Sequence, residues 1–438
     1  MLTIKTALEP RLQKRYEKLV TEHLSVKHTI AAGLSCLPAK GSAFASTQAA
    51  WRFFQNQRVT IAALLNPLLA CAKQAVAKQC REYALLVHDL TDLNYKNHTR
   101  KLERIKLNKG LCGYQLQSSL LLSDVSGDPL APVSQSLWTE KGLYTTRFED
   151  RIEDAAALDE LSKVIQESAS WQWNKPVVHI HDRGADSVGH YRQWISLQAL
   201  FLVRADAKPS VVWQQQSCSL GEIVSQLAFR FSRKVKIKGV TAKQYIAESE
   251  VEITRPAYPH RQRKGVVEGR KRIAGEAIKL RLVVSEIRDE KGKVLSQWLL
   301  YTNLPKSVKA KQIALWYYYR WEIESYFKLL KSAGQNLENW QQESPQALMK
   351  RLLVASMACV VVWQLGKAEG EDAKQARALL IRLSGRQMKW GVEFTDAALL
   401  AGLWSLLTML EVLGDYEIAQ LKQMAQTILP NFERFKET

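Results

Sequence analysis

The chain has 438 residues, of which 46% are hydrophobic and 24% are charged, a composition typical of a soluble globular protein of two or three domains. Its six cysteines include no C-x-x-C pair, which argues against a disulfide framework and a zinc site and favours a reducing compartment. The 62 lysines and arginines exceed the 43 aspartates and glutamates, giving a net charge of +19 that favours a polyanionic partner over a merely basic surface.

Two stretches bear on localisation. Residues 1–18 alternate charged with apolar residues and contain no uninterrupted apolar core of the kind that a signal peptide needs. The longest apolar run, Leu352–Leu365, is too short to span a bilayer and predicts a buried helix. We therefore expect a soluble, cytoplasmic protein with no membrane partner.

Residues 1–70 predict helices, because apolar residues recur at helical spacing in LEPRLQKRYEKLVTEHL and again from residue 47 onward. In the second of these segments Arg52 and Arg58 stand among aromatic and amide side chains. Such an arrangement could contact the phosphates and base edges of DNA. The alternative is a small helical bundle with ordinary polar corners.

From residue 81 the pattern changes to short strands. The apolar run Tyr83–Val87 ends in His88 and Asp89, and two more β-like runs follow on either side of an SGDP turn. An amphipathic helix comes next, and then the run PVVHIH, which ends in Asp182. Three strands, a helix and a strand, with acidic residues at two strand ends, is the order of an RNase H-like core.

Residues 205–300 predict a basic β-rich insertion into that core. RFSRKVKIKGV alternates Lys234, Lys236 and Lys238 with apolar residues, as a strand with one cationic face does. More cations follow around two prolines: Arg255, Arg261, Arg263, Lys264, Arg270, Lys271 and Arg272. The next stretch predicts a hairpin with its turn near DEKGK, and helix returns from about residue 370.

The stretch LWYYYRWEIESYFKLLKSAG, residues 315–334, predicts a single helix. One apolar stripe along it would pack on the core, beside a stripe of polar and charged side chains suited to a functional site. At about 100° per residue, five side chains share one arc of about 80°. They are Tyr317, Arg320, Glu324, Lys328 and Lys331. The alternative is a salt-bridged surface helix, since Glu324 and Lys328 form a favourable i,i+4 pair.

Asp89, Asp182 and Glu324 predict a metal centre. A carboxylate that directly follows an apolar strand lies at the edge of the sheet instead of in bulk water, and both aspartates have that position. Three carboxylates that converge repel one another unless a cation lies between them. Oxygen ligands suit Mg²⁺ or Mn²⁺, and two such ions could assist both the attacking and the leaving oxygen in phosphodiester chemistry.

Together these motifs resemble the DDE transposases of the insertion-sequence-four family. Tyr317-x2-Arg320-x3-Glu324-x6-Lys331 matches the Y-R-E-K signature of that family. HDLTDLNY resembles the motif around its first aspartate, and HDRGAD the motif around its second. TQAAWRFFQNQRVT is similar to its N-terminal DNA-binding segment, and QWLLYTNLP to the strand before the signature helix. The resemblance runs through most of the chain.

The resemblance implies roles for particular residues. Asp89, Asp182 and Glu324 would bind the divalent metals. The phosphates near the transposon end would be held by Tyr317, Arg320, Lys328 and Lys331.

Two further residues acquire roles from the same resemblance. Trp298 would stack on a flipped base, because aromatic faces stack on unpaired bases; the alternative is a buried strand tryptophan. Arg204, at the end of the run LFLV, would be an active-site arginine.

The resemblance also implies a domain organisation of the α/β class. Residues 1–70 would form a helical domain that binds DNA ends. Residues 71–370 would form an RNase H-like catalytic domain, a mixed sheet flanked by helices, with the β-insertion at about 205–300. Residues 371–438 would form a helical region used for dimerisation.

The resulting hypothesis is a cut-and-paste DNA transposase with two Mg²⁺ or Mn²⁺ ions. It would act as a homodimer on double-stranded DNA at terminal inverted repeats and on target DNA, in the cytoplasm and on the nucleoid. Cutting would pass through a hairpin before the 3′-ends join the target. The alternatives are an inactive DNA-binding relative or transposition inhibitor, and a structure-directed nuclease without strand transfer.

Overall fold

The computed structural model describes residues 5–24, 43–153, 155, 157–237, 240–258 and 272–428. Contacts within the chain define two compact units, a larger one of residues 60–327 and 344–349 and a smaller one of residues 1–59, 328–343 and 350–438. Several cations expected on the basic insertion lie outside the described residues: Lys238, Arg261, Arg263, Lys264, Arg270 and Lys271.

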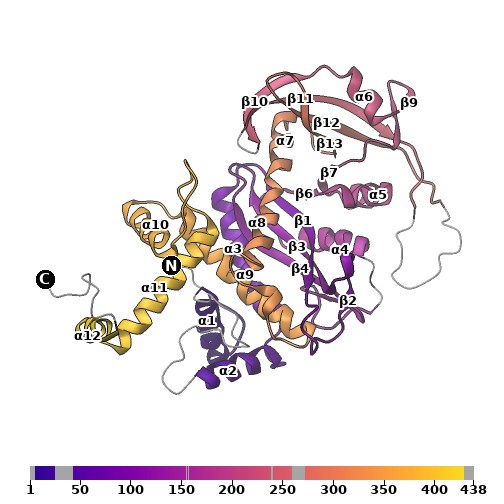
Figure 1. The fold of residues 1–438 in the computed structure, drawn as a ribbon. Helices are drawn as coiled ribbons and strands as arrows, with labels where there is room; N and C mark the ends of the chain where they lie inside the picture. The colour runs from indigo at the N-terminus through magenta and orange to yellow at the C-terminus, as the bar shows by residue number, and fades with distance from the viewer. Residues whose placement is uncertain are drawn as a thin grey trace. The chain divides into compact units, whose positions relative to one another are not determined.

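One mixed sheet organises the larger unit (Figure 1). Its strands are β1 (Ala84–Asn94), β2 (Ile105–Lys106), β3 (Cys112–Ser123), β4 (Pro129–Thr139), β5 (Gly142–Thr145), β6 (Val177–His181), β7 (Leu200–Arg204), β8 (Ser210–Trp213), β9 (Gln216–Ser219), β10 (Arg230–Ile237), β11 (Val240–Ile253), β12 (Ile278–Arg288) and β13 (Val294–Thr302). The order across the sheet is β5-β4-β3-β1-β6-β7-β13-β12-β11-β8-β9, with β2 beside β3 and β10 beside β11. The fold is therefore α/β with a large mixed sheet.

The centre of the sheet changes from antiparallel to parallel pairing at β1. This strand is antiparallel to β3 on one side and parallel to β6 on the other, and β6 is parallel to β7. Two helices, α4 (Ala157–Ser170) and α5 (Val188–Ser196), provide the crossovers. The predicted strands and helix follow one another as β1, β3, β4, α4 and β6, and the short strands β2 and β5 are added between them.

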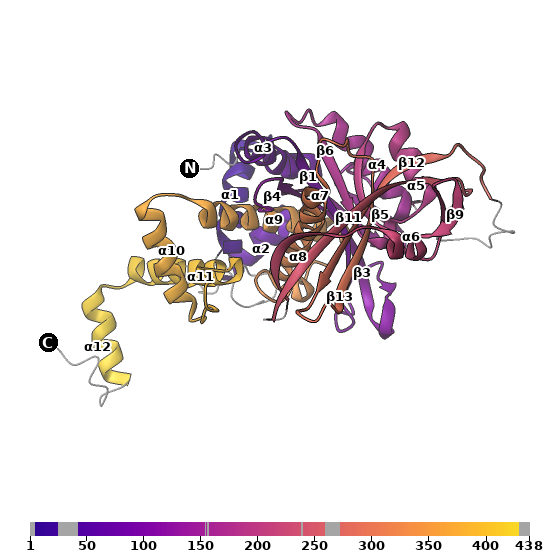
Figure 2. The same cartoon turned by 90° about the horizontal axis from the view of Figure 1, so that it is seen from above.

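Helices cover both faces of the central strands. Figures 1 and 2 show α4 and α5 on one side and α7 (Ala310–Tyr319) on the other. On the first side Tyr191 and Trp194 of α5 pack with Phe201 and Val203 of β7 in one buried cluster. Because both faces are covered, the central strands are continuous apolar runs instead of alternating ones.

The strands of the predicted insertion continue the same sheet beyond β7. β13 pairs with β7, where Leu300 lies opposite Arg204, and β12 and β13 form the hairpin predicted from the sequence. Its turn is closed by the Asp289 backbone N–H, which donates to Lys293 O at 3.0 Å, and Gly292 has the positive φ of 83° that the turn requires. A short helix, α6 (Leu220–Gln226), follows β9.

The stretch 315–334 is not the single helix that its periodicity predicts. α7 ends at Tyr319, α8 runs from Trp321 to Leu330, and Arg320 lies between them in right-handed helical geometry. The Arg320 N–H donates to Tyr317 O, and the Ile323 N–H donates to Arg320 O, both three residues back instead of four. The turn is therefore tightened at Arg320, and Lys331 lies beyond the end of the helix.

The smaller unit is helical. It contains α1 (Pro10–Leu24), α2 (Ala43–Gln55), α10 (Glu371–Ser384), α11 (Asp396–Asp415), α12 (Ile418–Ile428) and most of α9 (Pro345–Lys367). The His23 and Gln335 side chains join α1 to the turn after α8 through a 2.6 Å hydrogen bond between Nδ1 and Oε1. α3 (Ile61–Gln79) belongs to the larger unit and runs through residue 70, where a domain boundary was predicted.

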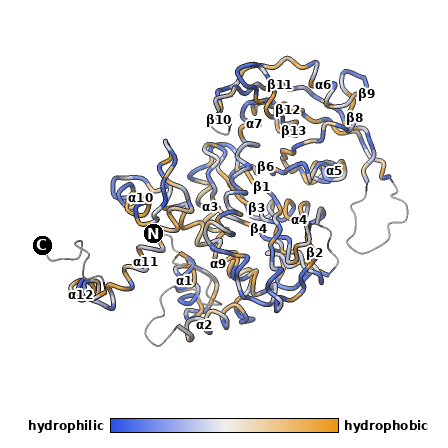
Figure 3. Tube along the Cα trace, viewed as in Figure 1, coloured by the Kyte–Doolittle hydropathy of each residue, from blue (hydrophilic) through white to orange (hydrophobic). Residues whose placement is uncertain are grey.

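Two helices of the described chain, α9 and α11, are long and apolar enough to cross a membrane by length and composition alone. Hydrophobic residues run through α9 (Figure 3), and 83% of its most apolar window is buried, as expected for a core helix. The buried helix predicted around Leu352–Leu365 is therefore confirmed. In α11 only 22% of the corresponding window is buried.

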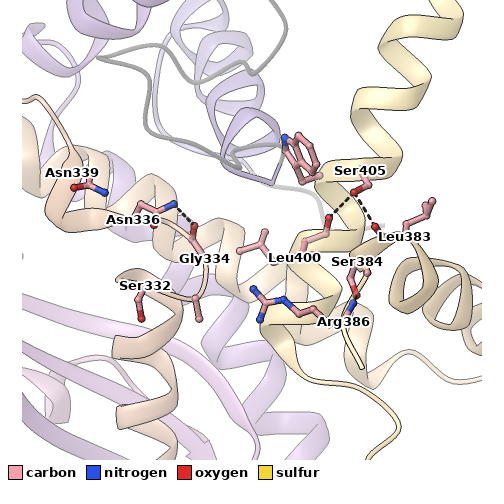
Figure 4. A pocket seen from close by; sticks show the side chains of 13 residues that line it. Ser332, Gly334, Asn336, Asn339, Leu383, Ser384, Arg386, Leu400 and Ser405 are labelled. Atoms are coloured by element: carbon pink, nitrogen blue, oxygen red, sulfur yellow. Dashed lines mark hydrogen bonds between the residues drawn. The ribbon is translucent and has the colours of Figure 1, made fainter. Parts of the chain in front are cut away.

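A cavity of about 610 Å³ lies in the smaller unit, between the turn after α8 and the segment that joins α10 to α11 (Figure 4). Its walls include Asn336, Asn339, Arg386 and Ser405. Ser405 donates to Leu383 O and Ala401 O, so its hydroxyl is already engaged. None of the residues predicted to act on DNA lines this cavity.

Candidate active site

The two predicted aspartates lie at the same level of neighbouring parallel strands. His88 of β1 is in register with His181 of β6, so Asp89 and Asp182 are the next residues on each side. β6 ends at His181, whereas β1 continues to Asn94 along its antiparallel partner β3. Asp89 is therefore not at the end of its strand, as the apolar run predicted; it lies where the strand beside it ends.

Each aspartate uses one carboxylate oxygen to accept a hydrogen bond from nearby backbone. Asp89 Oδ1 accepts from the Leu90 N–H, and Asp182 Oδ1 accepts from the Gly184 N–H, both at 2.8 Å. Asp182 thereby caps the short 3-10 helix Arg183–Ala185. These bonds fix the direction of both carboxylates.

Arg320 connects Asp89 to the third predicted carboxylate. Its Nη1 lies 2.5 Å from Asp89 Oδ2 and 3.9 Å from Glu324 Oε1, one turn further along α8. The Asp89 and Arg320 side chains are only 13% and 11% exposed, whereas the Glu324 side chain is 49% exposed. A buried guanidinium therefore lies where the carboxylates gather.

The electrostatics of Asp89 show that the other two acidic groups act on it. Burial raises the pKa of Asp89 to about 6. The charge of Arg320 and the Leu90 N–H lower this pKa, and the charges of Asp182 and Glu324 raise it. The mutual repulsion is that of carboxylates which share one neighbourhood and need a cation there.

Tyr317, Trp298 and Arg204 adjoin this cluster. The rings of Trp298 on β13 and Tyr317 on α7 meet edge to face, with centroids 5.2 Å apart. Trp298 is half-buried, so it is not the fully buried strand tryptophan of the alternative. Burial raises the pKa of Tyr317, and the charges of Arg320 and Arg204 lower it, which places both arginines near the phenol.

The helix that carries Glu324 is anchored to the sheet. Tyr326 of α8 accepts a hydrogen bond from Gln135 Nε2 of β4 at 2.9 Å, and Ser118 of β3 donates to Gln135 Oε1 at 2.5 Å. Ser118 is the residue that pairs with Asp89 across β1 and β3. The chain of contacts links the helix of the third carboxylate to the strand of the first.

Beneath the aspartates lies a buried stack of rings that motif reasoning missed. His88 stacks on His181, whose ring stacks on Trp194, with centroids 4.5 and 4.6 Å apart. His88 also bonds His179 at 3.0 Å between Nε2 and Nδ1. Burial lowers the pKa of His88, His179 and His181, so the stack is neutral. The signal was the pair His-Asp, which occurs at both positions.

The other four predicted residues belong to the smaller unit. Lys328 is in the last turn of α8, and Lys331 pairs with Glu338 at 3.4 Å. Arg52 on α2 is exposed, as is Arg58, which lies 3.9 Å from Glu9. Phe53 and Phe54 between them are buried, so these arginines project from an aromatic support. Their contacts with DNA stay a prediction.

The donor set suits a divalent metal, although the carboxylates do not form a closed cage. Among the described residues no group of three His, Cys, Asp or Glu side chains is close enough to hold an ion as it stands. The Arg320 guanidinium occupies the position between Asp89 and Glu324. Oxygen ligands around a partly buried, mutually repelling centre fit Mg²⁺ or Mn²⁺.

Comparisons with known proteins agree with this chemistry. Residues 148–361, a little under half of the chain, match the family model described as "Transposase DDE domain". The match includes Asp182, Arg204, Trp298 and the helix of Glu324, and Asp89 precedes it. It supports a transposase of the DDE class, a group whose catalytic domains depend in general on divalent metals.

Other comparisons add little. No curated protein matches the chain. A solved structure, the piggyBac transposase synaptic complex with hairpin DNA, aligns with 80% of this chain at 9% identity and a TM-score of 0.34. The chain spans 57% of the length of that protein, and a TM-score this low does not indicate a shared fold. The family-model match over residues 148–361 is thus what ties the geometry to a known class, the transposase DDE domain.

Proposed function

We propose that the protein is a metal-dependent, cut-and-paste DNA transposase of the insertion-sequence-four family, resembling the transposon-five transposase. The observation that carries the proposal is geometric: Asp89 and Asp182 lie side by side in the register of β1 and β6, and the buried guanidinium of Arg320 lies beside both Asp89 and Glu324. The order β1, β3, β4, α4, β6 and the parallel pairing of β1 with β6 support an RNase H-like core.

Asp89, Asp182 and Glu324 would hold the divalent metals, two of them if both oxygens of the reaction are assisted. Such ions, when bound, favour the attacking and leaving oxygens of a phosphodiester substitution. Arg320 and Arg204 would hold the negative phosphate oxygens, because a guanidinium pairs with two oxygens at once. Trp298, beside Tyr317, would stack on a base turned out of the duplex.

The reaction would proceed by successive substitutions at phosphorus. Water attacks the phosphodiester at the end of the element, and the 3′-oxygen leaves as a hydroxyl. That hydroxyl attacks a phosphodiester of the opposite strand, displaces the 3′-oxygen of the flanking DNA and forms a hairpin. A second water opens the hairpin and frees the 3′-hydroxyl again. The freed 3′-ends then attack target DNA. Each step needs an activated oxygen and a stabilised leaving group, so one set of carboxylates could serve them all.

Binding would be distributed over the chain. Arg52 and Arg58 would contact the terminal inverted repeats, and Lys328 and Lys331 the phosphates near the cut. The basic insertion would add counterion release and hence salt dependence. A homodimer formed through residues 371–438 would bring two ends together in the cytoplasm, on the nucleoid.

The test uses purified protein and DNA that carries the ends of its own element. With Mg²⁺ or Mn²⁺ the wild type should excise the element, and chelation with EDTA should stop cutting. Asp89→Asn, Asp182→Asn and Glu324→Gln should abolish cutting and leave band shifts with the ends intact. Asp92→Asn is the matched control, because Asp92 lies on the same strand with its side chain on the other face, and it should cut normally.

The outcomes separate the alternatives. If Asp182→Asn still cut, the assignment of the carboxylates would be wrong. Band shifts without cutting under any divalent metal would favour an inactive relative or inhibitor. Cutting without joining of 3′-ends to target DNA would favour a structure-directed nuclease.

A further inference from the structure

A second cation-lined cavity lies in the larger unit, away from the carboxylates. It has a volume of about 460 Å³ and is enclosed by four parts of the chain: the residues before β1, the turn between β3 and β4, strand β10, and the first turns of α7. The first, third and fourth of these parts each contribute one cation, respectively Arg81, Arg233 and Lys311. Cations from three separate elements that meet in a concavity repel one another, unless an anion joins them.

The three cations share the wall with two acidic residues, Glu82 and Asp124. No ion pair connects the side chains of Arg81, Arg233 or Lys311 to a carboxylate of a described residue. The two acidic residues in the wall differ in whether their carboxylates already accept hydrogen bonds. Asp124 accepts the backbone N–H groups of residues 81, 82 and 83 at 2.8–3.1 Å, so its carboxylate is committed to fixing that segment. Glu82 is exposed and has no such commitment.

The Arg233 side chain is fixed by a hydrogen bond to a buried residue of the neighbouring strand. Its Nε donates to Gln244 Oε1 at 2.8 Å, and Gln244 Nε2 donates to Ser285 Oγ at 2.8 Å. Gln244 and Ser285 are both buried. Arg233 also lies over the ring of Tyr318, 5.8 Å from its centroid. Because its Nε is bound to a buried partner, its two terminal amino groups are oriented before any ligand arrives.

The cavity faces away from the candidate active site. Lys311, Leu315 and Tyr318 share one face of α7, within about 60° at 100° per residue. Arg320 is about 180° around the helix from Lys311 by the same count. Figure 1 shows β10 beside α7, in the part of the sheet beyond β13. A ligand here is therefore not the phosphate at the carboxylates.

We propose that this cavity binds a backbone phosphate of duplex DNA and anchors the DNA at a point separate from the site of cutting. The choice of ligand rests on the proposed function. A phosphodiester suits the cavity because it offers two charged oxygens to the Arg233 fork and to two flexible cations. The exposed cation Arg230 lies on the same face of β10 as Arg233, because their partners Ile246 and Gln244 are two residues apart on β11, and it extends the positive surface along the strand.

The experiment measures DNA binding without metal, so that no cutting contributes. Fluorescence anisotropy of the full chain with a labelled duplex of unrelated sequence gives affinity over a series of salt concentrations. Losing one phosphate contact makes the negative slope of log K against log salt less steep by about 0.9. At ~0.1 M salt this corresponds to an affinity about eightfold weaker. Lys311→Gln and Arg233→Gln should each show this loss, and Arg233→Lys should recover most of it.

Two further variants sharpen the test. Glu82→Gln removes the uncommitted carboxylate from the wall and should tighten binding. Lys309→Gln is the matched control, because Lys309 precedes the same helix and is exposed, yet does not line the cavity; its slope should equal that of the wild type. The melting temperature of each variant checks that it is folded.

Slopes for Lys311→Gln and Arg233→Gln that equal the Lys309→Gln slope would overturn the proposal and leave the transposase assignment intact. Failure of the wild type to bind any DNA would instead remove the proposed function. Titration with inorganic phosphate provides a further arm. If Lys311→Gln weakened phosphate binding without changing the DNA slope, the cavity would hold a small phosphorylated ligand, and the proposal would be wrong.

Discussion

The environment of Asp89 is set by the end of strand β6 and by the Arg320 side chain. β6 stops one residue before the level of Asp89, and Arg320 arrives there from a position 231 residues later in the chain. The sequence predicted Asp89, Asp182 and Glu324 as a set from their motifs. It could not predict the guanidinium between Asp89 and Glu324, because helical periodicity places Arg320 and Glu324 on one stripe without saying what that stripe faces.

Glu167 on α4 offers a test of residue-level electrostatics away from the candidate site. Burial raises its pKa to about 7, the charge of Arg147 lowers it and that of Glu160 raises it. An acid whose folded pKa exceeds its unfolded value of 4.5 destabilises the fold increasingly as the pH rises from 4.5 to 7, and fully above 7.

Glu167→Gln should therefore raise the free energy of unfolding above pH 7, by about 1 kcal/mol after allowance for solvent screening of a partly exposed group. Below pH 4.5 the two proteins should be equally stable, because both then carry a neutral side chain. Urea unfolding at the two pH values measures this. The exposed Glu140→Gln is the control, and an equal gain for Glu167→Gln at both pH values would contradict the argument.

The histidines beneath the aspartates are a feature that sequence motifs do not predict. His88, His179 and His181 have no ligand spacing, and the repeated His-Asp pair at His88 and His181 does not by itself indicate that the rings stack. They meet because parallel register sets His88 beside His181, and because alternation along β6 sends His179 and His181 to the same face. Pairing of this kind is a tertiary property that no local pattern contains.

At the scale of elements, the junction of α7 and α8 shows a local pattern overridden by a distant contact. The run from Leu315 to Leu330 has helical periodicity throughout, yet the hydrogen bonds on either side of Arg320 shorten to three residues. Arg320 pairs with Asp89 on a different element. A predicted helix can be correct in its residues and still differ in its continuity.

The turn between β3 and β4 is pressed against α7, which gives a test with a matched pair of glycines. Gly127 and Gly292 both have positive φ, 77° and 83°. A Cβ on Gly127 would lie 2.3 Å from the Tyr319 ring, whereas a Cβ on Gly292 would meet nothing within 4 Å. Alanine at either position incurs the backbone strain, and only Gly127→Ala adds a steric clash with α7.

We expect Gly292→Ala to cost about 1 kcal/mol and Gly127→Ala about 2–4 kcal/mol, measured as the difference in free energy of unfolding in urea. Because Tyr319 adjoins Arg320, the Gly127→Ala protein should also cut DNA more slowly at a temperature where it is folded. Equal losses of stability for the two variants would show that Tyr319 moves aside without cost.

Over the whole molecule, the periodic and apolar signals located most strands and helices, whereas the division into units was not accessible to them. α8 and α9 each contribute residues to both units. A boundary inside a helix leaves no proline, glycine or charge run to mark it. The basic excess of the sequence likewise predicted a partner class and not the places where the cations gather.

The C-terminal helices allow a test of the proposed homodimer. α11 has no buried residue after Gly402 and is mostly exposed from Met409 onward, and α12 has no buried residue. Leu410 is 56% exposed, and burying it against a second copy would remove apolar surface from water. Leu410→Glu should therefore convert the dimer on DNA ends to a monomer, measured by light scattering.

Leu379→Glu is the control, since Leu379 is 46% exposed on α10, and it should leave the assembly unchanged. A wild type that stays monomeric on paired DNA ends would remove the proposed dimer. A Leu410→Glu protein that still dimerises would move the interface elsewhere.

The ladder between β13 and β7 has a mechanical consequence. Trp298 on β13 and Arg204 on β7 lie on adjoining strands of one sheet, and three residue pairs join these two strands. If the protein binds DNA as proposed, a load on the outer strands would be transmitted to Arg204 through these backbone hydrogen bonds. DNA binding by the outer strands would then affect the position of the active-site residues.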